Sequence, residues 1–433
     1  MHPDRRHSAF ELVPQKLIYG GDALGHYQGR PVLVPRALPG ERLEVEEIRT
    51  ARGVLRARPL KVLAAAPERV EAPCRYFGRC GGCHYQHFHA KDQSVAKREI
   101  LRETLRRLGR ISWDSEIPIH AAHPWNYRNQ AQFKVEGRAD GGVNLGFFAS
   151  ESHRVVDLDA CPILSPRLNA VLAALRAPEW SGRLGECREI EMLADDRDEE
   201  VMLTLRGAFG TEQGKVLAQD CLGCLPGVVC VATEEEGRCA PQVWGKAALV
   251  YAVKEFRYQV SPGCFFQASR FLLPELVEAV TGETAGSLAL DLFAGVGLFT
   301  LPLAQRFATV IGVEAGERAA ADLTTNARTH GLNNVRAVAQ TVYDFLRRFA
   351  QTSPDLVVFD PPRGGVGART LELLAALRPK RLQYVSCSPP TLARDLEFLQ
   401  KGGCHVESIE LFDLFPQTYH IECVARLVSK DSF

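Results

Sequence analysis

The chain has 433 residues, 46% of them hydrophobic, with 52 Lys and Arg against 52 Asp and Glu. This length exceeds one ordinary core and predicts two or three domains. The balanced charge excludes a globally basic nucleic-acid-binding protein, so any RNA affinity must come from local patches. The sequence MHPDRRHSAF at the start has no apolar signal segment, and no stretch reaches the roughly 20 apolar residues of a membrane span. We therefore expect a cytoplasmic protein without membrane contact.

Residues 1–65 alternate apolar and polar residues in short runs, separated by turn signals at Gly20-Gly21 and Pro39-Gly40. The pattern predicts a small OB-like β-barrel or sandwich. Its basic side chains are of the kind that bind RNA phosphates. On charge alone, a barrel surface exposed to solvent explains them equally well. These residues are Lys16, Arg30, Arg36, Arg49, Arg52, Arg56 and Arg58.

The sequence predicts a central α+β domain over residues 66–263. A helix is expected over 93–108, followed from about residue 118 by strands and turns, with a second helix near 167–176. Basic residues outnumber Glu99 and Glu103 along the first helix and predict one basic face; they are Lys97, Arg98, Arg102, Arg106, Arg107 and Arg110.

Four cysteines in this region have the spacing of a metal site. Cys74, Cys80 and Cys83 follow the pattern C-x5-C-x2-C in a glycine-rich turn, and Cys161, which precedes a proline, could add a fourth thiolate. Four thiolates can hold zinc or an iron–sulfur cluster, and the spacing alone does not decide between them. The three-plus-one grouping and the proline after Cys161 favour the cluster over the paired C-x2-C arms of a zinc ribbon.

From residue 264 onward, strands alternate with helices, which predicts an α/β, Rossmann-like doubly wound sheet. The strand over 287–293 runs into a turn with Gly295 and Gly297, and the next strand ends in Glu314, about where a ribose-binding carboxylate belongs. Two later strands end in Asp360 and Cys387. All these ends meet at the carboxyl edge of the sheet, where such folds bind ligands.

The combination of D-L-F-x-G-x-G at 291–297, a late acidic residue and D-P-P at 360–362 resembles the Rossmann-like S-adenosylmethionine methyltransferases. The S-C-x-P motif around Cys387, the H-x-E-C motif around Glu422 and F-F-Q at 265–267 narrow the resemblance to the RNA (uracil-5-)-methyltransferases. The resemblance implies that Cys387 is the nucleophile and Glu422 the general base. It assigns to the S-adenosylmethionine and uracil sites Gln267, Phe293, Glu314 and Asp360, with Gln340 as a further candidate for contact with the adenine. The family often has Asn where Leu298 stands, so a polar contact to the donor is absent.

The segment C-x5-C-G-G-C-x-x-Q-H at 74–87 resembles the iron–sulfur branch of this family, which includes bacterial 23S rRNA (uracil-5-)-methyltransferases. That resemblance implies a 4Fe–4S cluster on the four cysteines, a TRAM domain over 1–65 that binds RNA, and a methyltransferase domain over 264–433.

We therefore expect methyl transfer from S-adenosylmethionine to C5 of a uridine, with 23S rRNA as the favoured substrate and the tRNA T-loop uridine as the alternative. A non-catalytic iron–sulfur RNA-binding protein is the runner-up, and the presence of both Cys387 and Glu422 argues against it. A redox enzyme is a third reading, weakened because Thr300 replaces the third glycine of the dinucleotide fingerprint. No protein partner is implied, and we expect a monomer.

Overall fold

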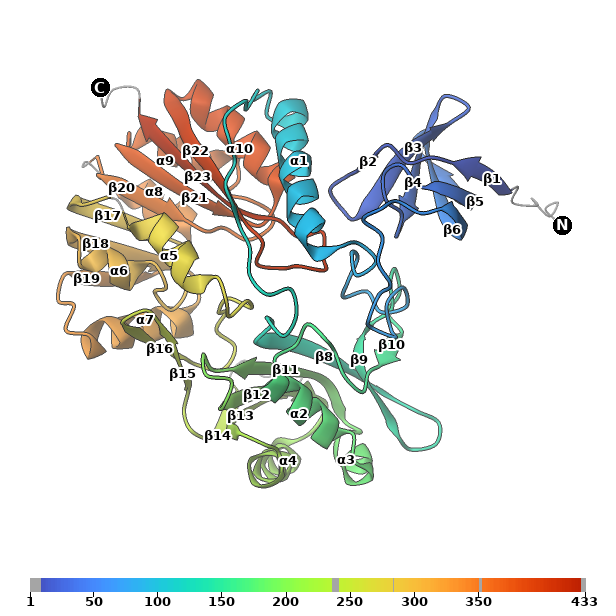
Figure 1. Ribbon diagram of the computed structural model, residues 1–433. Coiled ribbons are helices and arrows are strands. Elements are labelled where there is room, and N and C mark those ends of the chain that lie inside the picture. Colours follow the sequence, from blue (N-terminus) through green and yellow to red (C-terminus); the bar gives the residue numbers. More distant parts are fainter. Residues whose placement is uncertain (1–8, 236–240, 283, 350–352, 430–433) are drawn as a thin grey trace.

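The computed structural model describes residues 9–235, 241–282, 284–349 and 353–429. Residues 1–8, part of the start for which no signal segment was predicted, lie outside this range. Figure 1 shows three regions in chain order, an N-terminal sheet, a central sheet and a larger C-terminal sheet flanked by helices. Within the described residues no helix is both long and apolar enough to cross a membrane.

The N-terminal region is a six-stranded sheet with the order β1-β5-β6-β4-β3-β2 (Figure 1). Alternate residues are buried, as Val32 and Val34 in one strand and Leu43 and Val45 in another, so one face forms a core. Among the described strands no ladder joins β1 to β2, so the sheet is open and the predicted OB-like barrel is not shown. The physical reason is that β2 has only two residues and pairs with β3 alone. The strands are β1 (Ala9–Leu12), β2 (Lys16–Leu17), β3 (Asp22–Tyr27), β4 (Arg30–Pro35), β5 (Arg42–Ala51) and β6 (Val54–Ala64).

The central region is a seven-stranded sheet with the order β10-β9-β8-β11-β12-β13-β14, on which α2 and α4 pack. The helix expected near 167–176 is α2, which starts at a proline after Ser165, whose side chain accepts a hydrogen bond from the Leu168 amide. The elements are β8 (Gln130–Gly137), β9 (Val143–Phe148), β10 (Val155–Asp157), α2 (Pro166–Leu175), α3 (Pro178–Arg183), β11 (Cys187–Ala194), β12 (Val201–Gly207), α4 (Thr211–Cys224), β13 (Val228–Glu235) and β14 (Gln242–Gly245).

The C-terminal region is an eight-stranded sheet with the order β19-β18-β17-β20-β21-β23-β22-β7. The first five of these strands are parallel, and the chain moves outward from β17 before it returns to β20, so the strand order reverses between β17 and β20. The parallel ladders confirm the predicted α/β fold of this region, and open α/β sheets bind ligands at such a point of reversal. The elements are α5 (Leu273–Thr281), β17 (Gly286–Leu292), α6 (Thr300–Ala304), β18 (Phe307–Glu314), α7 (Glu317–Thr329), β19 (Val335–Ala339), α8 (Val342–Arg348), β20 (Leu356–Phe359), α9 (Ala368–Ala376), β21 (Arg381–Ser386), α10 (Pro389–Lys401), β22 (Cys404–Phe412) and β23 (Glu422–Ser429).

Three elements from the predicted central segment pack against the C-terminal region. The helix α1 (Ala90–Leu108) lies against α10 (Figure 1). The strand β7 (Ile119–His120) pairs in parallel with β22. The hairpin of β15 (Leu249–Val253) and β16 (Phe256–Val260) packs on α7. In the case of α1 and β7, the C-terminal layers therefore depend on residues that precede them by more than 100 positions.

The sequence predicted that Lys97 lies on a basic face of its helix, and the structure shows that this prediction is wrong. Its side chain is fully buried, and its Nζ donates to Asp413 Oδ1 at 2.7 Å and to the Phe415 carbonyl at 2.9 Å. A buried ammonium needs such partners because burial strips its hydration. The pair fixes α1 to the segment that leads into Glu422.

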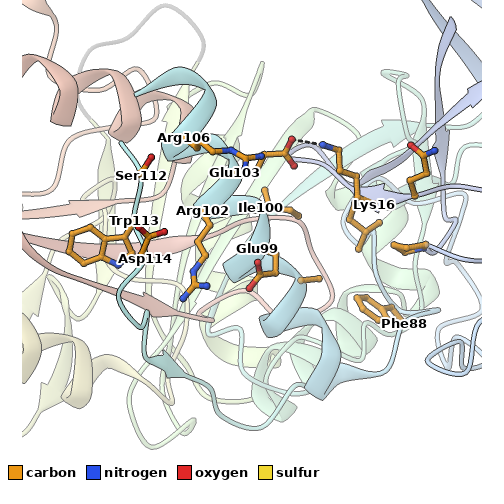
Figure 2. A pocket seen from close by; sticks show the side chains of 14 residues that line it. Lys16, Phe88, Glu99, Ile100, Arg102, Glu103, Arg106, Ser112, Trp113 and Asp114 are labelled. Atoms are coloured by element: carbon orange, nitrogen blue, oxygen red, sulfur yellow. Dashed lines mark hydrogen bonds and ion pairs between the residues drawn. The ribbon is translucent and has the colours of Figure 1, made fainter. Parts of the chain in front are cut away.

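The N-terminal sheet meets α1 across a cavity of about 640 Å³. Figure 2 shows the ion pair between Lys16 and Glu103 that bridges this junction, with Arg102 and Trp113 on the helix side. Acidic and basic side chains alternate along the lining, so the cavity has no charge preference. One hydrophobic cluster runs continuously from the N-terminal sheet through α1 to the C-terminal sheet.

Candidate active site

Cys387 and Glu422 come from neighbouring strands at the carboxyl edge of the C-terminal sheet. Cys387 directly follows β21, whereas Glu422 is the first residue of β23. Because β23 runs antiparallel to β21 with Ser386 opposite Cys423, the residue after Ser386 is level with the residue before Cys423. The register therefore brings the predicted nucleophile and the predicted base together. Cys387 is half-buried, and Glu422 is only 4% exposed.

Burial and acidic neighbours raise the pKa values of both groups. Burial raises the pKa of Cys387 to about 12, with further contributions from Glu422 and Asp360. Burial also raises the pKa of Glu422 well above its usual value, and Asp360 adds to the effect. The guanidinium of Arg363 opposes both shifts. Sequence reasoning missed this role of Arg363, although it directly follows the D-P-P motif.

The glycine turn after β17 is shaped for close packing on one side and for open space on the other. Phe293, Gly295 and Gly297 all have positive φ, at 66°, 54° and 101°. A Cβ on Gly297 would lie 2.5 Å from Leu323 Cδ1, so only glycine fits there, whereas a Cβ on Gly295 would meet nothing within 4 Å. The Gly295 amide donates to Glu314 Oε2 at 3.0 Å. The turn and the late acidic residue thus meet as the sequence predicts.

A second carboxyl group lies beneath the turn. Asp291 is 1% exposed and accepts a hydrogen bond from the Thr300 hydroxyl, and burial raises its pKa to about 7. The pKa of Asp360 is also raised to about 7, by burial and by the charge of Asp291. Gln267 Nε2 donates to Asp360 Oδ2 at 3.3 Å, which joins two predicted site residues. Asp291 was not predicted as a site residue because an acidic residue inside an apolar strand gives no signal of its surroundings.

Two further predicted positions differ in character. The backbone amide of Gln340 donates to the backbone carbonyl of Glu314 at 3.0 Å, so the two residues are neighbours at the end of β18. Leu298 is buried in the hydrophobic core beside α5 and α6. Its carbonyl accepts a hydrogen bond from the Tyr258 hydroxyl at 3.1 Å. A core role accounts for the apolar residue at position 298.

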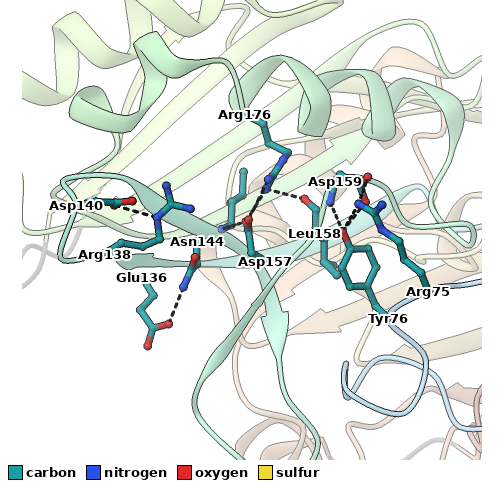
Figure 3. Close-up of polar contacts among 11 residues, drawn as sticks. Arg75, Tyr76, Glu136, Arg138, Asp140, Asn144, Asp157, Leu158, Asp159 and Arg176 are labelled. Atoms are coloured by element: carbon teal, nitrogen blue, oxygen red, sulfur yellow. Dashed lines mark hydrogen bonds and ion pairs between the residues drawn. The ribbon is translucent and has the colours of Figure 1, made fainter.

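The four predicted metal ligands line one cavity of about 990 Å³. Figure 3 shows how Tyr76, within the cysteine segment, approaches the loop before Cys161: its hydroxyl donates to Asp159 Oδ1 at 2.6 Å. Arg176 pairs with Asp157, the last residue of β10, just before that loop. Burial raises the pKa of Cys161 to about 11, and the neighbouring cysteines contribute.

The described residues hold no three Cys, His, Asp or Glu side chains that converge closely enough to hold one metal ion. The geometry therefore assembles the cysteines around a cavity but does not by itself show a metal centre. In a tetrahedral zinc site with bonds of about 2.3 Å, the sulfurs would have to approach one another to about 4 Å.

The same cavity extends from the cysteines to both neighbouring regions. Tyr419 and His420, which precede Glu422, form one end of it. Arginines of the N-terminal sheet form another part of its wall, and these are Arg36, Arg49, Arg56 and Arg58. Arginine and aromatic side chains therefore line one cavity together with the four cysteines and with His420, two residues before Glu422.

Comparisons with known proteins agree with this geometry. The sequence model of the tRNA (Uracil-5-)-methyltransferase family matches residues 242–430. An uncharacterized RNA methyltransferase of Aquifex aeolicus is 33% identical over 97% of this chain and 99% of its own length. Another of Halalkalibacterium halodurans is 30% identical over 99% of each chain. The crystal structure of Pyrococcus abyssi tRNA (uracil-54, C5)-methyltransferase in complex with S-adenosyl-L-homocysteine has a TM-score of 0.74, with 24% identity over 97% of this chain and 100% of that chain, and shares the fold. The chain therefore belongs to the family of RNA methyltransferases that these relatives represent, and the tRNA (Uracil-5-)-methyltransferase model matches its C-terminal part.

Proposed function

We propose that the protein transfers a methyl group from S-adenosylmethionine to C5 of a uridine in RNA, with Cys387 as nucleophile and Glu422 as base. The observation that carries this proposal is the register of β21 and β23, which sets the two side chains level at one sheet edge. The Pyrococcus abyssi structure, which holds S-adenosyl-L-homocysteine, supports the choice of donor. The open space above Gly295, beside Glu314, is where we expect the donor to bind.

Cys387 is needed because C5 of uracil is too weak a nucleophile to take a methyl group unaided. Its thiolate adds to C6, the electrophilic end of the enone, and the electron pair moves to C5. The donor, when bound, supplies an electrophilic methyl group on a positively charged sulfonium, whose charge favours the ionised forms of Cys387 and Glu422. The C5–methyl bond forms as the methyl–sulfur bond of the donor breaks, with S-adenosylhomocysteine as the leaving product, and the adduct still carries the C5 proton.

Glu422 completes the reaction by taking that proton. As the C5–H bond breaks, its electron pair reforms the C5–C6 double bond and expels the Cys387 thiolate from C6. Asp360 and Gln267, which are hydrogen-bonded to each other, are placed to orient the uracil. Arg363 offsets the negative charge that gathers when Glu422 and Cys387 ionise together.

For the RNA itself we propose 23S rRNA, with the tRNA T-loop uridine as the other candidate. The cysteine motif favours 23S rRNA, whereas the family description and the Pyrococcus abyssi relative favour tRNA. In this proposal residues 1–65 act as the RNA-binding region. Their arginines line the cavity that also contacts Tyr419 and His420, next to the active site. The enzyme then works in the cytoplasm, as a monomer without a protein partner.

We further propose that Cys74, Cys80, Cys83 and Cys161 hold a 4Fe–4S cluster. Their arrangement around one cavity suits a cubane, whose irons and sulfides stand between the thiolates and hold them further apart than a single ion would. When bound, the cluster would cross-link residues 74–83 to the loop at Cys161. The methylation needs no electron, so we assign it a structural role.

Glu422→Gln tests the proposed chemistry. This variant keeps the size of the side chain and loses the base, so methyl transfer can proceed while proton removal stalls. We expect a methylated RNA–protein adduct that survives denaturing electrophoresis, with transcripts of 23S rRNA and tRNA tested in parallel with labelled donor. Cys387→Ala should form no adduct and no product. Normal turnover by Glu422→Gln, or an adduct with Cys387→Ala, would overturn the assigned roles.

A further inference from the structure

Tyr19, a residue of the N-terminal sheet, reaches the catalytic edge of the C-terminal region. It lies in the turn between β2 and β3, in which the Gly21 amide donates to the Ile18 carbonyl at 3.2 Å. Gly20, the third residue of this turn, has a φ of 110°, which favours glycine. The turn thus presents Tyr19 at its second position, pointing away from its own sheet toward the active site.

Close packing holds this turn in place. Gly21 is buried, and a Cβ there would lie 3.3 Å from both His84 and Tyr419. The ring of Tyr19 meets that of Tyr419 edge-on, with centroids 5.5 Å apart and an interplanar angle of 86°. Tyr419 in turn contacts His84 and His420, with centroids 4.6 and 4.4 Å apart. The turn is therefore wedged between the cysteine segment and the loop that leads into Glu422.

The hydroxyl of Tyr19 contacts the turn that carries the nucleophile. Its Oη lies 3.5 Å from the carbonyl oxygen of Cys387, at the outer limit of a hydrogen bond, and it also interacts with the Ser388 side chain. Contacts of catalytic groups are often long in the free enzyme and shorten when substrate binds. Burial raises the pKa of Tyr19 to about 12, so the phenol remains a neutral donor at physiological pH.

We propose that Tyr19 is a positioning residue for Cys387, through which the N-terminal sheet fixes the nucleophile's turn for attack on C6. This inference rests on the proposed function. One side chain touches both the β21–α10 turn and Tyr419, three residues before the base. The methyltransferase region is consequently incomplete without the N-terminal sheet, even though residue 19 and residue 387 are far apart in sequence.

The test is Tyr19→Phe in the full-length chain, because phenylalanine keeps the ring packing and removes only the hydroxyl. The probe is a transcript of 23S rRNA or tRNA, whichever the wild type methylates, made with 5-fluorouridine, which traps the covalent adduct because fluorine cannot leave as a proton does. We expect the single-turnover rate of adduct formation to fall about three- to tenfold, as the loss of one hydrogen bond implies. The affinities for RNA and for S-adenosylmethionine should not change.

Tyr27→Phe is the matched control, since Tyr27 belongs to the same sheet and stacks on Phe10 at a centroid distance of 4.0 Å, outside the catalytic edge. It should form the adduct at the wild-type rate. A wild-type rate for Tyr19→Phe would overturn the inference, and so would a loss confined to RNA affinity. If the wild type itself forms no adduct, the proposed function fails instead, so the two failures are distinguishable.

Discussion

The raised pKa of Cys387 predicts that its thiol is unreactive in the free enzyme. With a pKa of about 12, roughly one thiol in ten thousand is ionised at pH 8, compared with about a quarter for an ordinary cysteine of pKa near 8.5. A thiolate of higher basicity is a better nucleophile, which recovers part of this difference. The net expectation is thiol–disulfide exchange roughly 50-fold slower than that of a cysteine-containing peptide.

Two substitutions should change this rate in opposite directions. Glu422→Gln removes a negative charge close to Cys387, and a unit charge at 4 to 10 Å in a medium of effective dielectric about 20 contributes roughly 2 to 4 kcal/mol. That interaction sets an upper limit of roughly 1.5 to 3 pKa units, so we expect the pKa of Cys387 to fall by up to this amount in the variant. Arg363→Met removes the opposing cation and should raise the pKa further.

The assay is modification with methyl methanethiosulfonate between pH 7 and 10, followed by peptide mass spectrometry. The exposed Cys224 of the same chain reports on access of the reagent in every sample. In the wild type, the modification rate of Cys387 should still rise with pH at the top of this range. Reaction of Cys387 at the peptide's rate at pH 8, or shifts of the same sign in the two variants, would refute the electrostatic account.

Three further predictions concern stability, the metal centre and RNA. Lys97→Met should lower the free energy of unfolding by about 3 to 5 kcal/mol in thermal unfolding, because it leaves Asp413 buried without its partner. Lys91→Met, on the exposed face of α1, should change it by less than about 0.5 kcal/mol. Equal effects of the two substitutions would contradict the pairing. Protein purified without oxygen should be brown and carry about four irons. Cys161→Ser should lower both the iron content and the melting temperature, whereas Cys224→Ser should lower neither. Stoichiometric zinc without visible absorbance would exclude the cluster. Arg49→Gln should weaken RNA binding and reduce the slope of log affinity against log salt by about one, with the affinity for the donor unchanged. Arg42→Gln, on the same sheet but outside the cavity, is the control and should leave RNA binding unchanged. A matching fall in donor affinity would contradict the proposed RNA-binding role.

The sequence by itself determined which polar residues stand at the strand ends. An apolar run that ends in Asp360 or Cys387 predicts a strand followed by a functional side chain, because parallel strands in an open α/β sheet end at one edge. The helix predicted over 93–108 is present as α1, since its apolar periodicity is local. The glycine turn was predictable because positive φ at Gly295 and Gly297 restricts the residue type.

Tertiary structure decided what no local pattern contains. Lys97 resembles the surface arginines of its helix until Asp413, 316 positions later, is folded against it. The N-terminal strands have barrel-like alternation, but closure depends on a ladder between β1 and β2, and the short β2 pairs only with β3. The contact of Tyr19 with the Cys387 turn arises because a glycine turn is wedged beside Tyr419. Burial, partner choice and the pKa of Cys387 all follow from such long-range packing, which sequence periodicity does not encode.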